Sequence, residues 1–138
     1  MLSRAKAIKE KINAGNASFV ESKITSIDIA DATVDCVISN CVINLVPTAE
    51  KQLAFHEMYR LLKTNGRVAI SDILLKQDLP DDLKSNMALY IGCVAGASRI
   101  KEYEIYLLEA GFKGLLSCNP RLKLQAEQND ALRHPDRG

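Results

Sequence analysis

Residues 34–47 read VDCVISNCVINLVP, and this stretch predicts how the chain folds. Its first part, 34–38, is a short apolar run rich in β-branched residues, which is typical of a strand buried on both faces of a sheet. Ser39 and Asn40 end the run with polar groups, and Cys41 follows at once. Because ligands of open α/β sheets bind just beyond the carboxyl ends of the strands, we expect the amide of Asn40 and the thiol of Cys41 at the edge of a binding crevice.

A second strand follows after one helix. The apolar spacing of 48–63 predicts a helix that Asn65-Gly66 ends. The next apolar run, 67–72, predicts another buried strand. Strand, helix and strand at this spacing predict a right-handed parallel βαβ unit. Asp72 would then end its strand on the same edge as Asn40 and line the same crevice, although an Asp at a strand end can also be only a turn former.

The rest of the chain predicts further elements of the same α/β class. They are helices over 2–13, 80–91 and 100–110, strands over 17–21 and 115–118, and a polar loop over 22–33. Gly111 is suited to cap the helix over 100–110 in the left-handed conformation. We expect one α/β domain over 1–120, with parallel strands at 17–21, 34–40 and 67–72 and flanking helices. The sequence over 121–138 is polar and without pattern, and predicts a poorly ordered tail.

Composition limits the classes of function. The chain has 138 residues, 47% of them hydrophobic, which is enough for one domain with a core. Lys and Arg total 18 against 17 acidic residues, a net charge of +1, which predicts neither nucleic acid nor an anionic membrane as partner. No apolar run approaches the roughly 20 residues of a membrane helix, and the first residues, MLSRAK, lack the apolar core of a secretory signal. We expect a cytoplasmic, reducing location.

The cysteines and His56 do not by themselves indicate a metal site, a redox site or a catalytic base. The cysteines are at positions 36, 41, 93 and 118. No Cys-x-x-Cys pair occurs, which disfavours a zinc ribbon or a redox motif, and a single cysteine is ordinarily a small buried hydrophobe. His56 falls on the polar side of the helix over 48–63, so we expect it at the surface rather than as a catalytic base.

Residues 39–47, SNCVINLVP, resemble the arsenite methyltransferases, enzymes that depend on S-adenosylmethionine. The similarity runs unbroken over 19–72. Within it, LKTNGR at 62–67 is similar to the Leu-Lys-x-Gly-Gly turn of Rossmann-like methyltransferases in general, so it indicates only the superfamily, whereas the SNCVINL run is much narrower. Residues 92–97, GCVAGA, look like the second cysteine site of the family. The resemblance covers roughly 2–112, which corresponds to the later half of the family's catalytic domain.

The resemblance implies a role for each matching residue. Cys41 and Cys93 would bind trivalent arsenic as thiolates, and soft sulfur ligands suit such a thiophilic centre. Asn40 would lie beside the methyl donor S-adenosylmethionine, and Lys23 with Ile24 would contact its adenine. The implied reaction is methyl transfer to thiolate-bound arsenic, with small thiols or a thioredoxin-type reductant as partners. The protein would act mainly by positioning the two reactants.

The sequence also departs from the family. A Gly-rich cofactor loop, the first two strands and the upstream relay cysteines have no counterpart, and Ser22-Lys23 stands where a Gly and often an acidic residue are expected. The resemblance therefore implies a truncated chain with a partial Rossmann-like methyltransferase fold, its first strands missing. The strand over 34–40 would then be an exposed apolar edge, able to aggregate or to pair with another chain. We expect the chain alone to bind S-adenosylmethionine weakly or not at all. Cys36 and Cys118 match no arsenic position and are interpreted as packing residues.

Two other functions stay open. The chain could be a methyltransferase for another small molecule, and the thiols at 41 and 93 discriminate, since arsenic needs both and an oxygen or carbon acceptor needs neither. It could also be an inactive remnant or a partner subunit that keeps the fold without the activity. The absence of a Gly-rich loop favours this last interpretation for the isolated chain.

Overall fold

The described part of the chain contains both helices and strands, as an α/β fold requires. The computed structural model describes residues 1–77, 94, 96–118 and 123–128. The elements in chain order are α1 (Leu2–Lys11), β1 (Val34–Asn40), the 3-10 helix η1 (Ile43–Leu45), α2 (Thr48–Leu61), β2 (Leu62–Ser71), α5 (Ile100–Ala110), β3 (Phe112–Cys118) and β4 (Lys123–Gln128). The helix predicted over 80–91 lies outside the described residues.

The strands of the described residues form one sheet in the order β1-β2-β4-β3. β1 and β2 are parallel, and their register pairs Val37 with Val68 and Asn40 with Ser71. β4 is antiparallel to both β2 and β3. The parallel βαβ unit and the α/β class predicted from the sequence are thus confirmed.

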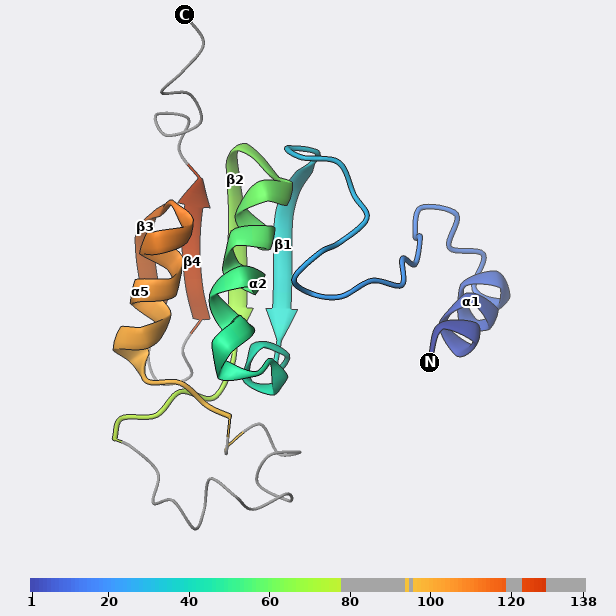
Figure 1. Cartoon of the computed structure of the whole chain (residues 1–138). Helices are drawn as coiled ribbons and strands as arrows, with labels where there is room; N and C mark the ends of the chain where they lie inside the picture. The colour runs from blue at the N-terminus through green and yellow to red at the C-terminus, as the bar shows by residue number, and fades with distance from the viewer. Residues whose placement is uncertain (78–93, 95, 119–122, 129–138) are drawn as a thin grey trace, which may run out of the picture.

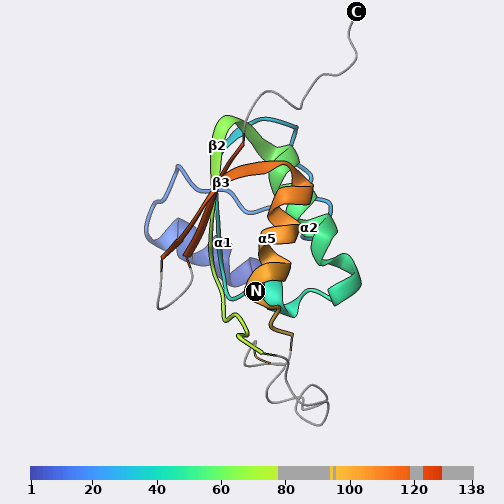
Figure 2. The same cartoon turned by 90° about the vertical axis from the view of Figure 1, so that its left-hand side faces the viewer.

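α2 and α5 cover the same face of the sheet (Figure 1, Figure 2). Alternate residues of a strand point to one face, so Val68 and Ile70 of β2 are buried beneath these helices. The ring of Phe55 in α2 lies 5.4 Å from that of Tyr103 in α5, in an edge-to-face contact. The other buried members of this core are Ile43, Met58, Leu62, Leu107, Ala110 and Phe112. One apolar core therefore joins both helices to the sheet.

β2 begins directly at the end of α2, earlier than predicted. Its pairing with β1 is irregular before Arg67, so residues 63–66 bulge from the ladder. Asn65 has a φ of 64°, and a Cβ added to Gly66 would lie 2.8 Å from the carbonyl oxygen of Lys63. The helix end predicted at Asn65-Gly66 is therefore wrong, because α2 ends at Leu61 and these two residues lie within β2.

The strand predicted over 17–21 is wrong. Residues 17–22 have no regular secondary structure, and Phe19 and Val20 are 42% and 49% exposed. A strand must pair its backbone groups with a neighbour, and no strand of the described residues lies beside this segment. The loop predicted over 22–33 is confirmed, with one isolated bridge between Lys23 and Ser26.

Part of the polar tail predicted over 121–138 is a strand. β4 lies between β2 and β3 and pairs with both of them. Its sequence, KLQAEQ, has apolar residues only at positions 124 and 126, so its composition did not distinguish it from a tail. The strand predicted over 115–118 is confirmed as β3, which begins three residues earlier at Phe112.

α1 stands apart from the core. It ends at Lys11, before the predicted end at 13, buries none of its residues, and lies beyond the edge of β1 (Figure 1). β1 is an edge strand of the described sheet, and Ile38 on it is 79% exposed. The exposed apolar edge predicted for residues 34–40 is therefore confirmed. Among the helices of the described residues, none is long and apolar enough to cross a membrane.

Candidate functional site

The carboxyl ends of β1 and β2 carry the polar groups that the sequence predicts there. Asn40 is paired with Ser71 in the ladder and is exposed. Cys41 follows with a φ of 51°, and its backbone N–H donates to the carbonyl oxygen of Ser71 at 2.9 Å. This positive φ turns the chain out of the strand, and Cys41 is exposed. Asn40 and Cys41 thus lie together at the predicted edge.

Buried polar groups fix the turn that follows Cys41. Asn44 in η1 is fully buried, and its Nδ2 donates to the carbonyl oxygen of Ile73 at 2.7 Å. The hydroxyl oxygen of Tyr103 lies 2.7 Å from Oδ2 of Asp72 and 3.2 Å from Oδ1 of Asn44. Because Tyr103 is a fully buried residue of α5, this helix is joined through it to both the turn and the end of β2.

Asp72 directly follows β2 at this edge, as predicted. Burial raises the pKa of its carboxyl group. Hydrogen bonds from the Tyr103 hydroxyl and from the backbone N–H groups of Ile43 and Cys41 lower that pKa in part, as does the charge of Lys51. Burial first, and then the hydrogen bond to Asp72, raise the pKa of the Tyr103 phenol. The hydroxyl therefore keeps its proton and acts as a donor.

Lys51 of α2 is a second buried anchor near this edge. Its Nζ donates to the carbonyl oxygen of Gly96 and, at 2.8 Å, to Oγ of Ser98. Burial lowers the pKa of the ammonium group. The chain is thus tied to α2 shortly after Cys93, which itself lies outside the described residues. The structure therefore places Cys41, while the predicted pairing of its thiol with Cys93 lies outside the described residues.

Lys23 and Ile24 begin a tight turn in which the N–H of Ser26 donates to the carbonyl oxygen of Lys23 at 3.0 Å. Lys23 is exposed, whereas Ile24 is half-buried and packs against the core. Directly after this turn, the N–H of Ile27 donates to Oε1 of Glu57 at 2.6 Å. The loop is therefore attached to α2 close to the residues predicted to contact adenine.

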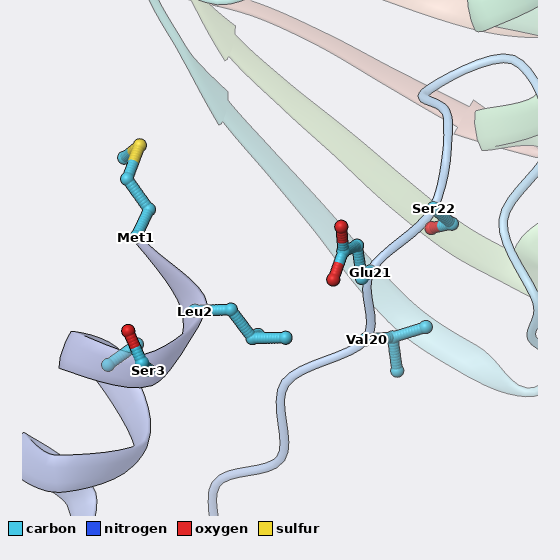
Figure 3. A pocket seen from close by; sticks show the side chains of 7 residues that line it. Met1, Leu2, Ser3, Val20, Glu21 and Ser22 are labelled. Carbon is cyan, nitrogen blue, oxygen red and sulfur yellow. The ribbon is translucent and has the colours of Figure 1, made fainter.

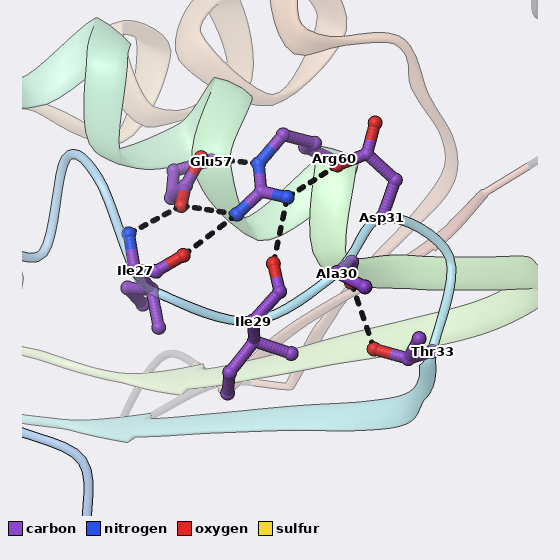
Figure 4. Close-up of polar contacts among 7 residues, drawn as sticks. All are labelled: Ile27, Ile29, Ala30, Asp31, Thr33, Glu57 and Arg60. Carbon is purple, nitrogen blue, oxygen red and sulfur yellow. Dashed lines mark hydrogen bonds and ion pairs between the residues drawn. The ribbon is translucent and has the colours of Figure 1, made fainter.

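Arg60, in the last turn of α2, holds the same loop (Figure 4). Its guanidinium donates to the carbonyl oxygens of Ile27 and Ile29, both at 2.9 Å. It also pairs with Glu57 at 2.7 and 2.8 Å and with the exposed Asp31. The hydrogen bond from Arg60 is the largest cause that lowers the pKa of Glu57. An ionised Glu57 and Arg60 thus fix the path of the loop.

A hollow of about 650 Å³ lies between α1 and the segment that precedes the tight turn (Figure 3). None of the residues predicted to bind arsenic or the cofactor lines it. Its lining consists of Met1, Leu2, Ser3, Ala5, Val20, Glu21 and Ser22. This hollow is therefore not the crevice predicted at the carboxyl ends of the strands.

The sequence did not predict the roles of Asn44, Lys51 and Tyr103. Asn44 interrupts the apolar run VINLV, and this was a usable signal, since a polar group in a buried segment must find partners. Lys51 and Tyr103 carry no comparable signal, because their partners come from distant parts of the chain. His56 is exposed, as predicted, and Cys36 is half-buried in β1.

Comparison with known proteins agrees with this geometry. A family described as a methyltransferase domain matches residues 1–126. The arsenite methyltransferase of Halobacterium salinarum is 43% identical over 115 residues, which are 83% of this chain and 29% of that protein. The arsenite methyltransferase of Mus musculus is 38% identical over 112 residues, 79% of this chain and 28% of that protein.

A solved structure shows the same fold. The crystal structure of an arsenic(III) S-adenosylmethionine methyltransferase from Chlamydomonas reinhardtii matches with a TM-score of 0.63 at 24% identity, over 82% of this chain and 44% of that one. The chain spans less than a third of the length of the two curated relatives, 29% and 28%. With a family match over 1–126 and a partial Rossmann-like sheet, the chain belongs to the methyltransferase domain family.

Proposed function

We propose that this chain contributes to an arsenite methyltransferase, which transfers a methyl group from S-adenosylmethionine to thiolate-bound trivalent arsenic. The observation that carries the proposal is Cys41, an exposed thiol at the carboxyl edge of β1 inside the SNCVINL run. The two arsenite methyltransferases that align over 83% and 79% of the chain support it.

The proposed arsenic ligands are Cys41 and Cys93. Arsenous acid condenses with two thiols by exchanging two As–O bonds for two As–S bonds, and two water molecules leave. Sulfur is the soft ligand that such a centre prefers. The hydrogen bonds of Asn44 hold the Cys41 turn in place, and Lys51 ties the chain to α2 shortly after Cys93. Both anchors favour a return of the second thiol to the same edge.

The residues proposed to contact the cofactor are Lys23, Ile24 and Asn40. Lys23 and Asn40 are exposed, and Ile24 is half-buried. The hollow beside α1 is lined by none of the three. These residues therefore do not enclose a molecule of the size of S-adenosylmethionine. We assign them one wall of its site, which a further part of a methyltransferase domain would complete.

The edge of β1 is the proposed place for that further part. A parallel strand is ordinarily covered on both sides, and an exposed apolar edge is a template for pairing with another strand. β1 lies at the end of the sheet of the described residues and provides such an edge. We propose a reducing, cytoplasmic location, where small thiols or a thioredoxin-type reductant keep the exposed Cys41 reduced.

Binding of a trivalent phenylarsenical, followed by mass spectrometry, tests the arsenic site. We expect the adduct to be lost in Cys41→Ser and in Cys93→Ser. Cys36→Ser and Cys118→Ser serve as controls and should retain it. Undiminished binding in the double variant Cys41→Ser, Cys93→Ser would remove arsenic from the function of this chain.

The exposed edge of β1 favours a second candidate, a partner subunit without activity of its own. Such a subunit would bind the arsenical but form no methylated product when mixed with arsenite and S-adenosylmethionine. Product formation by the purified chain, detected by mass spectrometry, would exclude this candidate. Activity that arises only after a polypeptide with a Gly-rich loop is added would support it.

A further inference from the structure

Tyr103 makes contacts that packing alone does not require. Its ring is fully buried against Phe55, and a phenylalanine would fill almost the same space. A buried hydroxyl is unfavourable unless it is hydrogen-bonded. The Tyr103 hydroxyl lies 2.7 Å from Oδ2 of Asp72 and 3.2 Å from Oδ1 of Asn44. Its single proton is therefore shared between two acceptors, with the shorter contact to Asp72.

Both acceptors belong to the frame of the Cys41 turn. Asn44 lies three residues after Cys41, and its Nδ2 donates at 2.7 Å to the backbone just beyond Asp72. Asp72 follows Ser71, whose carbonyl oxygen accepts the N–H of Cys41 at 2.9 Å. The turn is thus tied to the end of β2 at two points, and Tyr103 bridges them from α5.

Cys41 depends on this frame. It is exposed, so packing does not hold it, and its φ of 51° is uncommon for a residue other than glycine. A backbone of this kind persists only where the surrounding structure holds it. The fully buried Asn44 and Tyr103 supply rigid contacts on the inner side of the turn.

We propose that Tyr103 is a positioning residue for Cys41: its hydroxyl, through Asn44 and Asp72, sets the orientation of the turn from which the thiol reaches arsenic. The inference rests on the proposed arsenic-binding role of Cys41. Tyr103 would thus affect arsenic binding from α5 without touching arsenic itself.

Tyr103→Phe in the full chain tests the inference, because it removes only the hydroxyl. Tyr59→Phe is the matched control, since it also removes one hydroxyl but lies at the far end of α5, where its ring packs against Phe112 and beside Gly111. We expect the Kd of a phenylarsenical to rise about tenfold in Tyr103→Phe, the order of one lost hydrogen bond with a stranded buried acceptor. In Tyr59→Phe the Kd should stay within about twofold of the unaltered chain.

Further variants separate positioning from stability. Gly111→Ala strains a backbone with a φ of 104° at the far end of α5, so it should lower stability and leave the Kd unchanged. Asp72→Leu removes the acceptor of the Tyr103 hydroxyl and of the N–H groups of Ile43 and Cys41, so its Kd should rise at least as much as in Tyr103→Phe. Asp72→Asn keeps one acceptor oxygen, so its Kd should rise less than in Asp72→Leu. This pair keeps the test available if Tyr103→Phe does not fold.

Amide hydrogen exchange over residues 41–45 is a readout that does not depend on arsenic. We expect exchange there to be about tenfold faster in Tyr103→Phe and unchanged in Tyr59→Phe. No arsenical adduct on Cys41 of the unaltered chain would refute the proposed function, while exchange would still test Tyr103. The positioning role is overturned if Tyr103→Phe changes neither the Kd nor the exchange, or if Gly111→Ala raises the Kd equally.

Discussion

Replacing Glu57 by glutamine should loosen the loop that follows the Lys23–Ser26 turn. The Glu57 side chain is only 8% exposed, accepts the N–H of Ile27 at 2.6 Å, and pairs with Arg60 at 2.7 and 2.8 Å (Figure 4). A glutamine has the same shape but only one acceptor oxygen. If that oxygen keeps the bond to Ile27, the NH₂ group faces the guanidinium, donor against donor.

The expected loss in free energy of unfolding is about 2 kcal/mol, since a hydrogen bond to a charged group contributes about 1.5–3 kcal/mol. For a chain of this length, that loss lowers Tm by about 6 °C. Asp31→Asn is the matched control, because it removes the other acid that pairs with Arg60. Asp31 is 71% exposed, and exposed ion pairs contribute little, so its replacement should leave the free energy of unfolding unchanged within error.

The pH dependence gives a second check. The hydrogen bond from Arg60 is the main cause that holds the pKa of folded Glu57 below its ordinary value of 4.5. A carboxyl group of this kind contributes stability that is present above pH 4.5 and is lost as the pH falls through the folded pKa. In urea unfolding, the difference between the unaltered chain and Glu57→Gln should therefore shrink below pH 4.5. Two results would refute the reasoning. One is an equal loss in the free energy of unfolding in Glu57→Gln and Asp31→Asn at pH 7. The other is a difference between the unaltered chain and Glu57→Gln that does not change with pH.

Three further expectations concern the cofactor, the α5 cap and the edge of β1. Calorimetric titration with S-adenosylmethionine should show no micromolar binding, about −8 kcal/mol, because the described residues do not enclose it; a micromolar Kd would contradict this. Gly111→Ala should cost about 2 kcal/mol in urea unfolding, since its φ is 104° and an added Cβ would lie 2.9 Å from the ring of Tyr59; an unchanged midpoint would show that the cap relaxes. Ile38→Lys should reduce self-association in sedimentation without loss of stability, because Ile38 is 79% exposed on the edge strand; unaltered association would exclude this edge as an interface.

Local pattern predicted the elements whose partners follow closely in the sequence. β1, α2 and β2 form one βαβ unit, and two apolar runs, the helical spacing between them and the right-handed crossover rule were enough to predict it. The burial of the first run on both faces was wrong, because Ile38 is 79% exposed. The segment 17–21 has the composition of a strand, but a strand exists only with a neighbour, and none of the described strands lies there. β4 shows the reverse, since its place between β2 and β3 provides the pairing that its own composition does not indicate.

The residues of the candidate site likewise fall into those that the sequence predicted and those that it did not. Asn40 and Cys41 were predictable because they directly follow a strand, and the carboxyl edge of a sheet is where ligands bind. Tyr103 and Lys51 were not, because their roles depend on contacts to Asn44 and Asp72, and to Ser98, that only the fold creates. Periodicity assigns such residues to the core or to a solvated face, and it cannot identify a hydrogen-bond partner far along the chain.

Buried polar groups lie in two places, beside the loop that Glu57 holds and at the carboxyl ends of β1 and β2. The core beneath α2 and α5 is built from apolar side chains, among them Leu62, Val68 and Phe112. At the carboxyl ends of β1 and β2, by contrast, Asn44 and Lys51 are almost completely buried. Burying an amide or an ammonium group is unfavourable even when it is paired, and apolar residues of the same size would often be more stable. Such a cluster, beside an exposed thiol on a disfavoured backbone, is consistent with the arsenic site that we propose at Cys41.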